Sequence, residues 1–201
     1  MRSALHLLVR DALRAARLIP VPKSSPGVRP IAIGELFARV ASVFALPTGS
    51  QPADIFSDGI QLGLGVKSGV ERAVLTVQAL LDKHIEENDI IAISTDIRNA
   101  FNTVHRHRIM SALADKPETR HLCSLFEWSH GGSSLLLVYG KDRGLSKVIL
   151  SQEGVQQGHP LGTLCYDMAV HSDYAAVQTE FRHRHVRLVA IHDDLTIVGP
   201  A

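Results

Sequence analysis

The sequence predicts an α+β fold in which helices pack on one face of an antiparallel sheet. Apolar repeats of helical period alternate along the chain with short runs of β-branched residues. Two hairpin signals, at residues 140–144 and 193–194, each join two such runs. Apolar residues make up 45% of the 201 residues, which is enough for a core in one domain or two small ones.

The first half of the chain is predicted to be mostly helical. A helix is expected over residues 3–18, ended by Pro20 and Pro22. A strand over 28–33, a helix over 34–46, a loop over 47–65 and a helix over 69–87 follow. The last of these places its apolar side chains on one face: Val70, Val74, Val77, Leu80, Leu81 and Ile85.

The second half is predicted to alternate strands with helices. A β-branched run from Ile90 ends at Asp96 and reads as a central strand. The remaining elements are helices over 103–114, 119–130 and 164–177, hairpin strands over 135–139 and 147–150, and two short strands over 188–191 and 195–198.

Three carboxylates stand at the ends of these predicted strands. Asp193 and Asp194 lie at the tip of the last hairpin, where an Asp pair can also be ordinary turn chemistry. Asp96 ends the central strand. If the two strands are neighbours, the three carboxylates converge and could hold two divalent cations through hard oxygen ligands.

Residues 154–162 form a third notable stretch, rich in turn formers. Gly158 and Gly162 let the backbone approach a flat ligand closely, and Pro160 suits the first turn of the following helix. An ordinary strand-to-helix loop would have the same composition.

Together these stretches resemble the reverse transcriptase domain of non-LTR retrotransposons. The pattern Asp96-x-x-Asn-Ala-Phe101, residues 154–162 and the Asp193–Asp194 pair are similar to its palm motifs A, B and C, in that order. Residues 19–23 and 27–33 resemble its fingers motifs, and residues 61–71 resemble a Gly-rich block of these elements. The resemblance runs from about residue 18 to residue 200.

The resemblance implies an RNA-directed DNA polymerase that transfers nucleotides with two metal ions, Mg²⁺ or Mn²⁺. Residues 1–88 would be the fingers and the fingers–palm connection, and residues 89–201 the palm. The open face of the palm sheet would receive an RNA template, a DNA primer and deoxynucleoside triphosphates. The family continues into a thumb and carries an endonuclease, so both are expected in a full-length protein and absent from this stretch.

The resemblance also implies residue roles. The metal ligands would be Asp96, Asp193 and Asp194, with Asp193 the most important, and the backbone of Ile97 could add an oxygen. The expected nucleotide contacts are Lys23 and Arg29 at the triphosphate, Phe101 under the sugar, and Gln157 and Gly158 at the sugar and base. Phe101 could instead be a core residue that starts a helix.

Some positions depart from the family pattern. Ile191 replaces an aromatic residue, His192 stands before the Asp pair, and His159 replaces an Asp. Two alternatives therefore stay open: a catalytically inactive nucleic-acid-binding or scaffold protein derived from a reverse transcriptase, and an inert fragment of a decayed copy.

Charge and composition add limits. The net charge is only +1, but basic residues gather in residues 1–30 and 182–187, whereas residues 82–89 are acidic. Basic patches suit a polyanion, although each could be a solvated face. No apolar run approaches the roughly 18 residues of a membrane span, so no membrane partner is predicted. No secretory signal is visible, and a eukaryotic protein of this kind would be nuclear or cytoplasmic.

Overall fold

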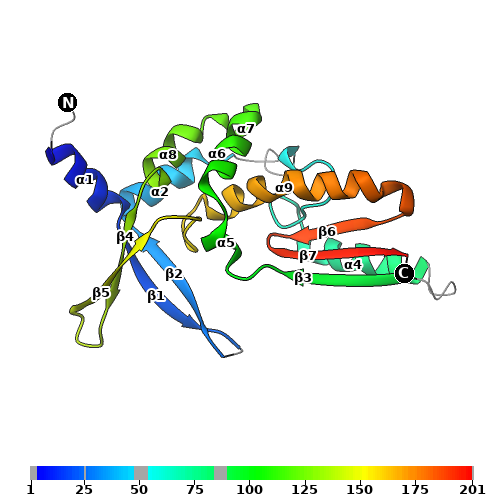
Figure 1. Ribbon diagram of the computed structural model, residues 1–201, viewed down its shortest axis with the longest axis horizontal. Helices are drawn as coiled ribbons and strands as arrows, with labels where there is room; N and C mark the ends of the chain where they lie inside the picture. The colour runs from blue at the N-terminus through cyan, green and yellow to red at the C-terminus, as the bar shows by residue number, and fades with distance from the viewer. Residues whose placement is uncertain (1–3, 25, 48–53, 84–89, 201) are drawn as a thin grey trace. The chain divides into compact units, whose positions relative to one another are not determined.

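The computed structural model describes residues 4–24, 26–47, 54–83 and 90–200, and the chain packs into two compact units (Figure 1). Unit 1 contains residues 1–46 and 101–165, and unit 2 contains residues 47–100 and 166–201. Each unit is therefore built from two stretches far apart in sequence. The predicted division into fingers and palm at residues 88 and 89 concerns functional regions and stays a prediction.

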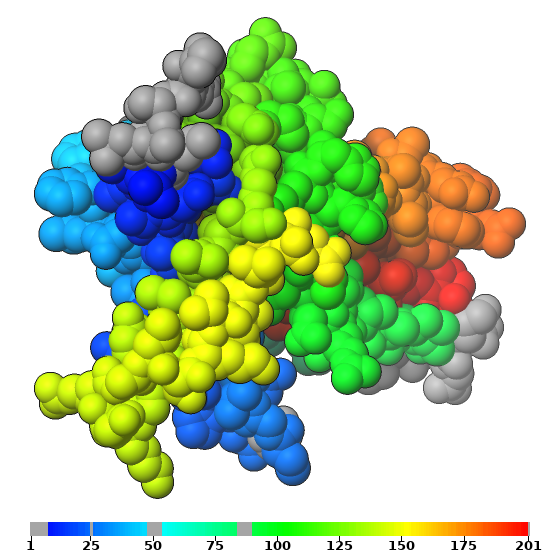
Figure 2. Space-filling model, turned by 60° about the vertical axis from the view of Figure 1, so that its left-hand side comes forward, coloured from blue at the N-terminus to red at the C-terminus, as the bar shows by residue number. Residues whose placement is uncertain are grey.

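Unit 1 contains a four-stranded sheet in the order β2-β1-β4-β5. Two antiparallel hairpins, β1–β2 and β4–β5, are joined by a parallel pairing between β1 and β4. The hairpin signal at residues 140–144 is confirmed, and the β4–β5 hairpin projects from the rest of unit 1 (Figure 2). The strands are β1 (Ala16–Pro22), β2 (Val28–Gly34), β4 (Ser134–Tyr139) and β5 (Leu145–Ser151).

The predicted helix over residues 3–18 is too long. Helix α1 spans Ala4–Arg14, and strand β1 begins at Ala16. Pro20 lies inside this strand, paired with Pro30 of β2. Because proline cannot continue a helix, residues 16–22 form a strand instead: all of them pair with β2, and Ala16 and Arg17 also pair with β4.

Several helices of unit 1 bury apolar side chains. The predicted helix over 119–130 divides into α7 and α8, with Pro117 opening α7 as prolines often do. The helices are α2 (Leu36–Ala45), α5 (Ala100–Thr103), α6 (Arg106–Asp115), α7 (Pro117–Arg120) and α8 (Cys123–His130). Their most deeply buried side chains are Ile109, Leu113, Leu122 and Phe126.

Two arginines, Arg14 and Arg106, donate hydrogen bonds to backbone carbonyls at the end of α8 and in the loop at residue 154. Arg14 donates from Nε to the carbonyl of Ser129 (3.1 Å) and from Nη2 to that of Gly132 (2.6 Å), at the end of α8. Arg106 donates from Nε to the carbonyl of Gly154 (2.9 Å) and from Nη1 to that of His130 (2.8 Å). The loop at residue 154 is thereby fixed to the end of α8.

Unit 2 contains a three-stranded antiparallel sheet in the order β3-β7-β6. Residues 60–62 add a short parallel bridge to β6, since Ala190 N donates to Ile60 O (2.8 Å) and Leu62 N donates to Ala190 O (2.9 Å). The elements are β3 (Ile90–Asp96), β6 (Arg187–Ile191), β7 (Asp194–Pro200), α4 (Gly69–Lys83), a short 3₁₀ turn (Arg182–Arg184) and the helix α9 (Gly162–Phe181), which enters the unit at residue 166.

Helices contact both faces of β6. Leu188 and Ala190 belong to one cluster with Tyr174 of α9, whereas Val189 packs with Ala73 of α4. Because successive strand residues point to opposite faces, α9 and α4 cover opposite faces there. The prediction of helices on one face only is therefore wrong at β6, although β3 stays open, with Ile93 49% exposed.

Helix α4 is also rotated from its predicted orientation. Val70 and Val74 are 60% and 62% exposed, while Ala73 is buried and Val77 packs beside it. Ile85 and most of the acidic run over residues 82–89 lie outside the described residues. Among the described residues, no helix combines the length and apolar character that crossing a membrane requires.

Candidate functional site

Two of the predicted metal ligands face each other in the sheet of unit 2. In the register of β3 and β7, Asp96 is paired with Asp194. Asp193 occupies the turn between β6 and β7. The prediction that the Asp96 strand and the Asp193–Asp194 hairpin are neighbours is confirmed, and the three aspartates gather at one end of the sheet.

The electrostatics of Asp193 reflect this crowding. Its pKa is raised above the ordinary value, first by burial and then by the negative charges of Asp194 and Asp96. Like charges directly opposite in a sheet destabilise the pairing, and a divalent cation would relieve the repulsion. Within the described ranges, no three acidic, histidine or cysteine side chains form a ready-made metal-binding group, so metal binding here stays a prediction.

The backbone of Ile97 continues directly from β3. Its carbonyl oxygen accepts a hydrogen bond from Ala100 N (3.2 Å). A carbonyl oxygen has two lone pairs, so this bond leaves one for the predicted metal contact. Asn99 turns the chain with a left-handed backbone, φ 55°, which asparagine tolerates well.

The turn that carries Asp193 is held by two buried residues that sequence reasoning missed. His192 has a left-handed backbone, φ 57°. Gln61 Oε1 accepts a hydrogen bond from His192 N (3.0 Å), and His192 Nδ1 lies 2.9 Å from Asp167 Oδ2. Gln61 and Asp167 are each only 1% exposed. The hydrogen bond raises the pKa of His192, whereas burial raises that of Asp167.

The motif B residues belong to unit 1, where they pack against β2. Gln157 O accepts a hydrogen bond from Ala32 N (2.7 Å). Gly158 has φ 99°, and a Cβ there would stand 2.7 Å from Ala32 O. The close approach expected at Gly158 is therefore present, but the group that approaches is the backbone of Ala32 and not a ligand.

Gln157 also faces a pocket of about 370 Å³ in unit 1. Its Oε1 is buried and has no hydrogen-bond partner among the described residues. Asn102 and Gln152 supply further amides to the same pocket. These groups could pair with the edge of a planar polar ligand, as a nucleotide contact at Gln157 requires.

Phe101, Lys23 and Arg29 also lie in unit 1. The Phe101 ring is half-buried, and its carbonyl accepts a hydrogen bond from Val155 N (2.7 Å), which joins motif A to the motif B loop. Lys23 and Arg29 lie on the exposed β1–β2 hairpin, where Arg29 pairs with Val21. Their nucleotide roles stay predictions.

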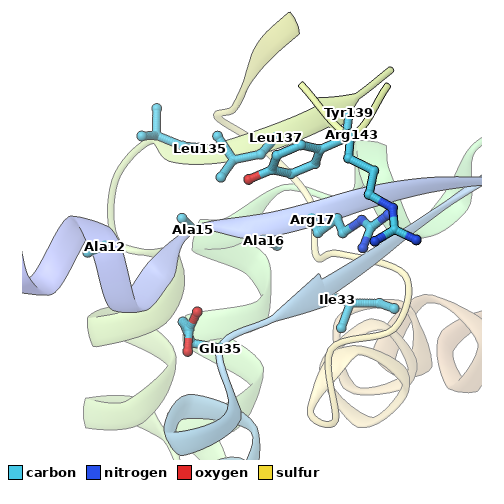
Figure 3. A pocket seen from close by; sticks show the side chains of 10 residues that line it. All are labelled: Ala12, Ala15, Ala16, Arg17, Ile33, Glu35, Leu135, Leu137, Tyr139 and Arg143. Atoms are coloured by element: carbon cyan, nitrogen blue, oxygen red, sulfur yellow. The ribbon is translucent and has the colours of Figure 1, made fainter. Parts of the chain in front are cut away.

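The N-terminal basic cluster divides into a structural and an exposed part. Arg14 is 7% exposed and bonded to carbonyls, so it is not available to a polyanion, contrary to the expectation for this cluster. Arg17 is exposed and lies over the Tyr139 ring, 5.4 Å from its centre. With Arg143 it lines an open pocket of about 710 Å³ (Figure 3). The exposed cluster over 182–187 keeps its basic side chains in solvent.

Comparison with known proteins places these features in context. No protein-family model matches the sequence. The chain is 26% identical over 188 residues to the 132 kDa protein of the retrotransposable element SLACS from Trypanosoma brucei gambiense. That match covers 94% of this chain but only 15% of the SLACS protein.

The fold is similar to that of solved telomerases. Telomerase from Candida tropicalis, in complex with a TWJ fragment of telomeric RNA, gives a TM-score of 0.61 at 11% identity, over 95% of this chain and 37% of that one. The corresponding complex from Candida albicans gives 0.59 at 13% identity, over 97% and 39%. The match to a retrotransposon protein and the similarity to the telomerase fold are both consistent with the reverse transcriptase domain that the motifs resemble.

Proposed function

We propose that this chain carries the nucleotidyl-transfer site of an RNA-directed DNA polymerase. The observation that supports it best is the pairing of Asp96 with Asp194 beside Asp193, whose pKa is raised by burial and then by their charges. Like charges that face each other across a sheet cost stability unless a cation compensates them.

The oxygen donors of Asp96, Asp193 and Asp194 fit Mg²⁺ or Mn²⁺, which prefer such hard ligands. A bound pair of ions would neutralise charge on the attacking and leaving oxygens of a phosphoryl transfer. The chain's own residues then bind and orient. Lys23 and Arg29 would hold the triphosphate of the incoming nucleotide, with the guanidinium suited to paired phosphate oxygens.

The base and sugar would be positioned by other residues of unit 1. Gln157, whose Oε1 has no partner within the described ranges, and Gly158 would lie at the sugar and base, and Phe101 would exclude a 2′-hydroxyl. An RNA template is proposed because two of the telomerase neighbours were solved with RNA. The DNA primer and deoxynucleoside triphosphates follow from the reaction. The chain spans only 15% of the SLACS protein, so the proposal concerns nucleotidyl transfer alone and no other activity of that protein.

Addition of a single nucleotide to a DNA primer on an RNA template tests this proposal, because one addition does not require a processive enzyme. We expect incorporation that depends on Mg²⁺ or Mn²⁺ and is abolished by Asp193→Asn. Asp115→Asn, at the exposed end of α6, is the control and should behave as the parent. Equal incorporation by Asp193→Asn and the parent would refute the proposal.

A catalytically inactive nucleic-acid-binding protein is the second candidate. It is favoured by the lack of a ready-made three-ligand metal group among the described residues. This candidate predicts RNA binding that weakens with salt, together with no nucleotide incorporation and no response to Mg²⁺ or Mn²⁺.

A further inference from the structure

Gln61 holds the backbone of the turn that presents Asp193. Its Oε1 accepts two hydrogen bonds, from His192 N (3.0 Å) and from Gly63 N (2.9 Å). Its Nε2 lies 3.4 Å from the His192 carbonyl oxygen. One side chain therefore joins both sides of the His192 backbone to residues 61–63. A buried amide with these partners has little freedom to move.

The segment that carries Gln61 is itself anchored. Ile60 and Leu62 bond to Ala190 of β6, as described above. Asp58 Oδ1 accepts a hydrogen bond from Ile60 N (3.1 Å), and Asp58 Oδ2 lies 2.9 Å from His171 Nε2 of α9. Gln61 is thus fixed by the sheet on one side and by α9 on the other.

The His192 side chain is held from a second direction. Asp167 of α9 contacts its Nδ1 at 2.9 Å. Gly63 leaves the space that the ring needs, because a Cβ at residue 63 would stand 2.7 Å from His192 Cε1 and 2.9 Å from Nε2. The Gly-rich block therefore packs against the motif C turn. Gln61 supplies the hydrogen bonds, and Gly63 leaves room for the His192 ring.

This restraint matters because the turn is strained. A left-handed backbone is strained at a residue other than glycine, and His192 adopts one with φ 57°. The next residue is Asp193. Any relaxation of His192 toward an ordinary conformation would swing Asp193 away from Asp96 and Asp194.

We propose that Gln61 is a positioning residue for Asp193, and that with Asp167 it locks His192 in the left-handed conformation that places Asp193 beside Asp96. This inference rests on the proposed function, because it assigns the purpose of the lock to the cation site. Groups that orient the ligands of a metal commonly change its affinity by about 10–100-fold when they are removed.

Binding of Mn²⁺ alone to the 201-residue chain tests the inference, followed by the electron paramagnetic resonance signal of the free ion. Gln61→Met removes the hydrogen bonds at similar size, and Asp167→Leu removes the side-chain contact. Asp167→Asn loses the charge but keeps an acceptor for His192, so it separates positioning from electrostatics. Gln78→Met, at the surface of α4, is the matched control for Gln61→Met.

We expect Gln61→Met and Asp167→Leu to bind Mn²⁺ at least about 10-fold more weakly than the parent. Asp167→Asn and Gln78→Met should bind within about twofold of it. Amide exchange at His192, measured by NMR, should accelerate in Gln61→Met and stay unchanged in Gln78→Met, because only the former frees that N–H.

A folded Gln61→Met that binds Mn²⁺ like the parent would overturn the inference and leave the proposed function standing. If Gln61→Met loses its cooperative thermal transition, Asp167→Leu decides the question in the same way. A parent chain that binds no Mn²⁺ would refute the proposed function, and the inference with it.

Discussion

Asp96 and Asp194 are paired directly across β3 and β7, so two carboxylates face each other at the end of the sheet. Side chains opposite one another in an antiparallel pair have Cβ atoms about 4.5–5.5 Å apart. Their repulsion adds to that of Asp193 in the adjacent turn. The folded state therefore has more to gain from a divalent cation than the unfolded chain.

Mg²⁺ or Mn²⁺ is expected to raise the Tm of the chain, because a ligand that binds only the folded state stabilises it. The response should be clearly smaller in Asp193→Asn, which removes one charge from the cluster. Differential scanning fluorimetry against metal concentration gives the measurement. Equal shifts in the two proteins would contradict the prediction.

Phe101 is expected to select deoxynucleotides if it lies under the incoming sugar. In any active preparation, Phe101→Val should lower the ratio of kcat/KM for dGTP over GTP, because a smaller side chain admits the 2′-hydroxyl. An unchanged ratio with activity retained would mean that the half-buried ring serves only the packing of unit 1.

Acid should destabilise unit 1 through His159. Burial lowers the pKa of His159 from 6.5 to about 4 in the folded protein. Above pH 6.5 the ring is neutral in both states, whereas between pH 6.5 and 4 only the unfolded chain takes the proton. The free energy of unfolding should therefore fall by up to about 3 kcal/mol over that interval. His130, edge-on to His159 at 4.8 Å, has its pKa lowered by burial too and adds to the fall.

Urea denaturation at several pH values measures this effect. His159 Nδ1 accepts a hydrogen bond from Leu161 N at 3.2 Å. His159→Asn keeps an acceptor for that bond, but the asparagine side chain cannot be protonated in this pH range. Its free energy of unfolding should fall less between pH 6.5 and 4 than that of the parent.

Arg106→Lys should destabilise unit 1 although it keeps the charge. A guanidinium reaches several acceptors at once, whereas an ammonium cannot reproduce that fork. We expect a loss of about 2–4 kcal/mol in the free energy of unfolding, from carbonyl groups left without a donor. The acceptors of Arg106 are the carbonyls of His130, Gly132, Ser151, Glu153 and Gly154 and the hydroxyl of Ser151.

Arg120→Lys is the matched control for that substitution, because Arg120 is exposed and its Nε donates to one carbonyl, that of Ala114, at 2.9 Å. Its cost should stay below about 1 kcal/mol. Urea denaturation measures the free energy of unfolding of both variants. Losses of equal size would show that the hydrogen bonds of Arg106 do not stabilise unit 1.

The elements predicted well are those whose signals are local. Both hairpins, the strand that ends at Asp96 and the helix over 164–177 have their pattern and their turn residues within about 20 residues of sequence. Residues 16–18 were predicted as the end of a helix, and the strand β4 that pairs with Ala16 and Arg17 lies more than 100 residues away. Apolar spacing cannot reveal such a partner.

The candidate site divides in the same way. The three aspartates were found because their residue type and their places at strand ends carry the chemistry. Gln61 and Asp167 were missed because nothing in their own neighbourhood marks a buried polar residue. Gln61 lies 131 positions from His192, and the block around it drew notice for its glycines. Only the folded structure shows which buried polar groups form hydrogen bonds with one another.

The pairing of β1 with β4 has a consequence for synthesis. The strands β1 and β2 are close in sequence and can pair once both have been made, whereas the edge of β1 that pairs with Leu136 stays open until the chain has passed residue 137. Likewise Asp96 has no partner strand among the described elements until β7 is complete. Closing such long loops is slow and leaves strand edges exposed to other chains. A chain in which these partner strands have not yet formed is therefore vulnerable to misassembly with other chains.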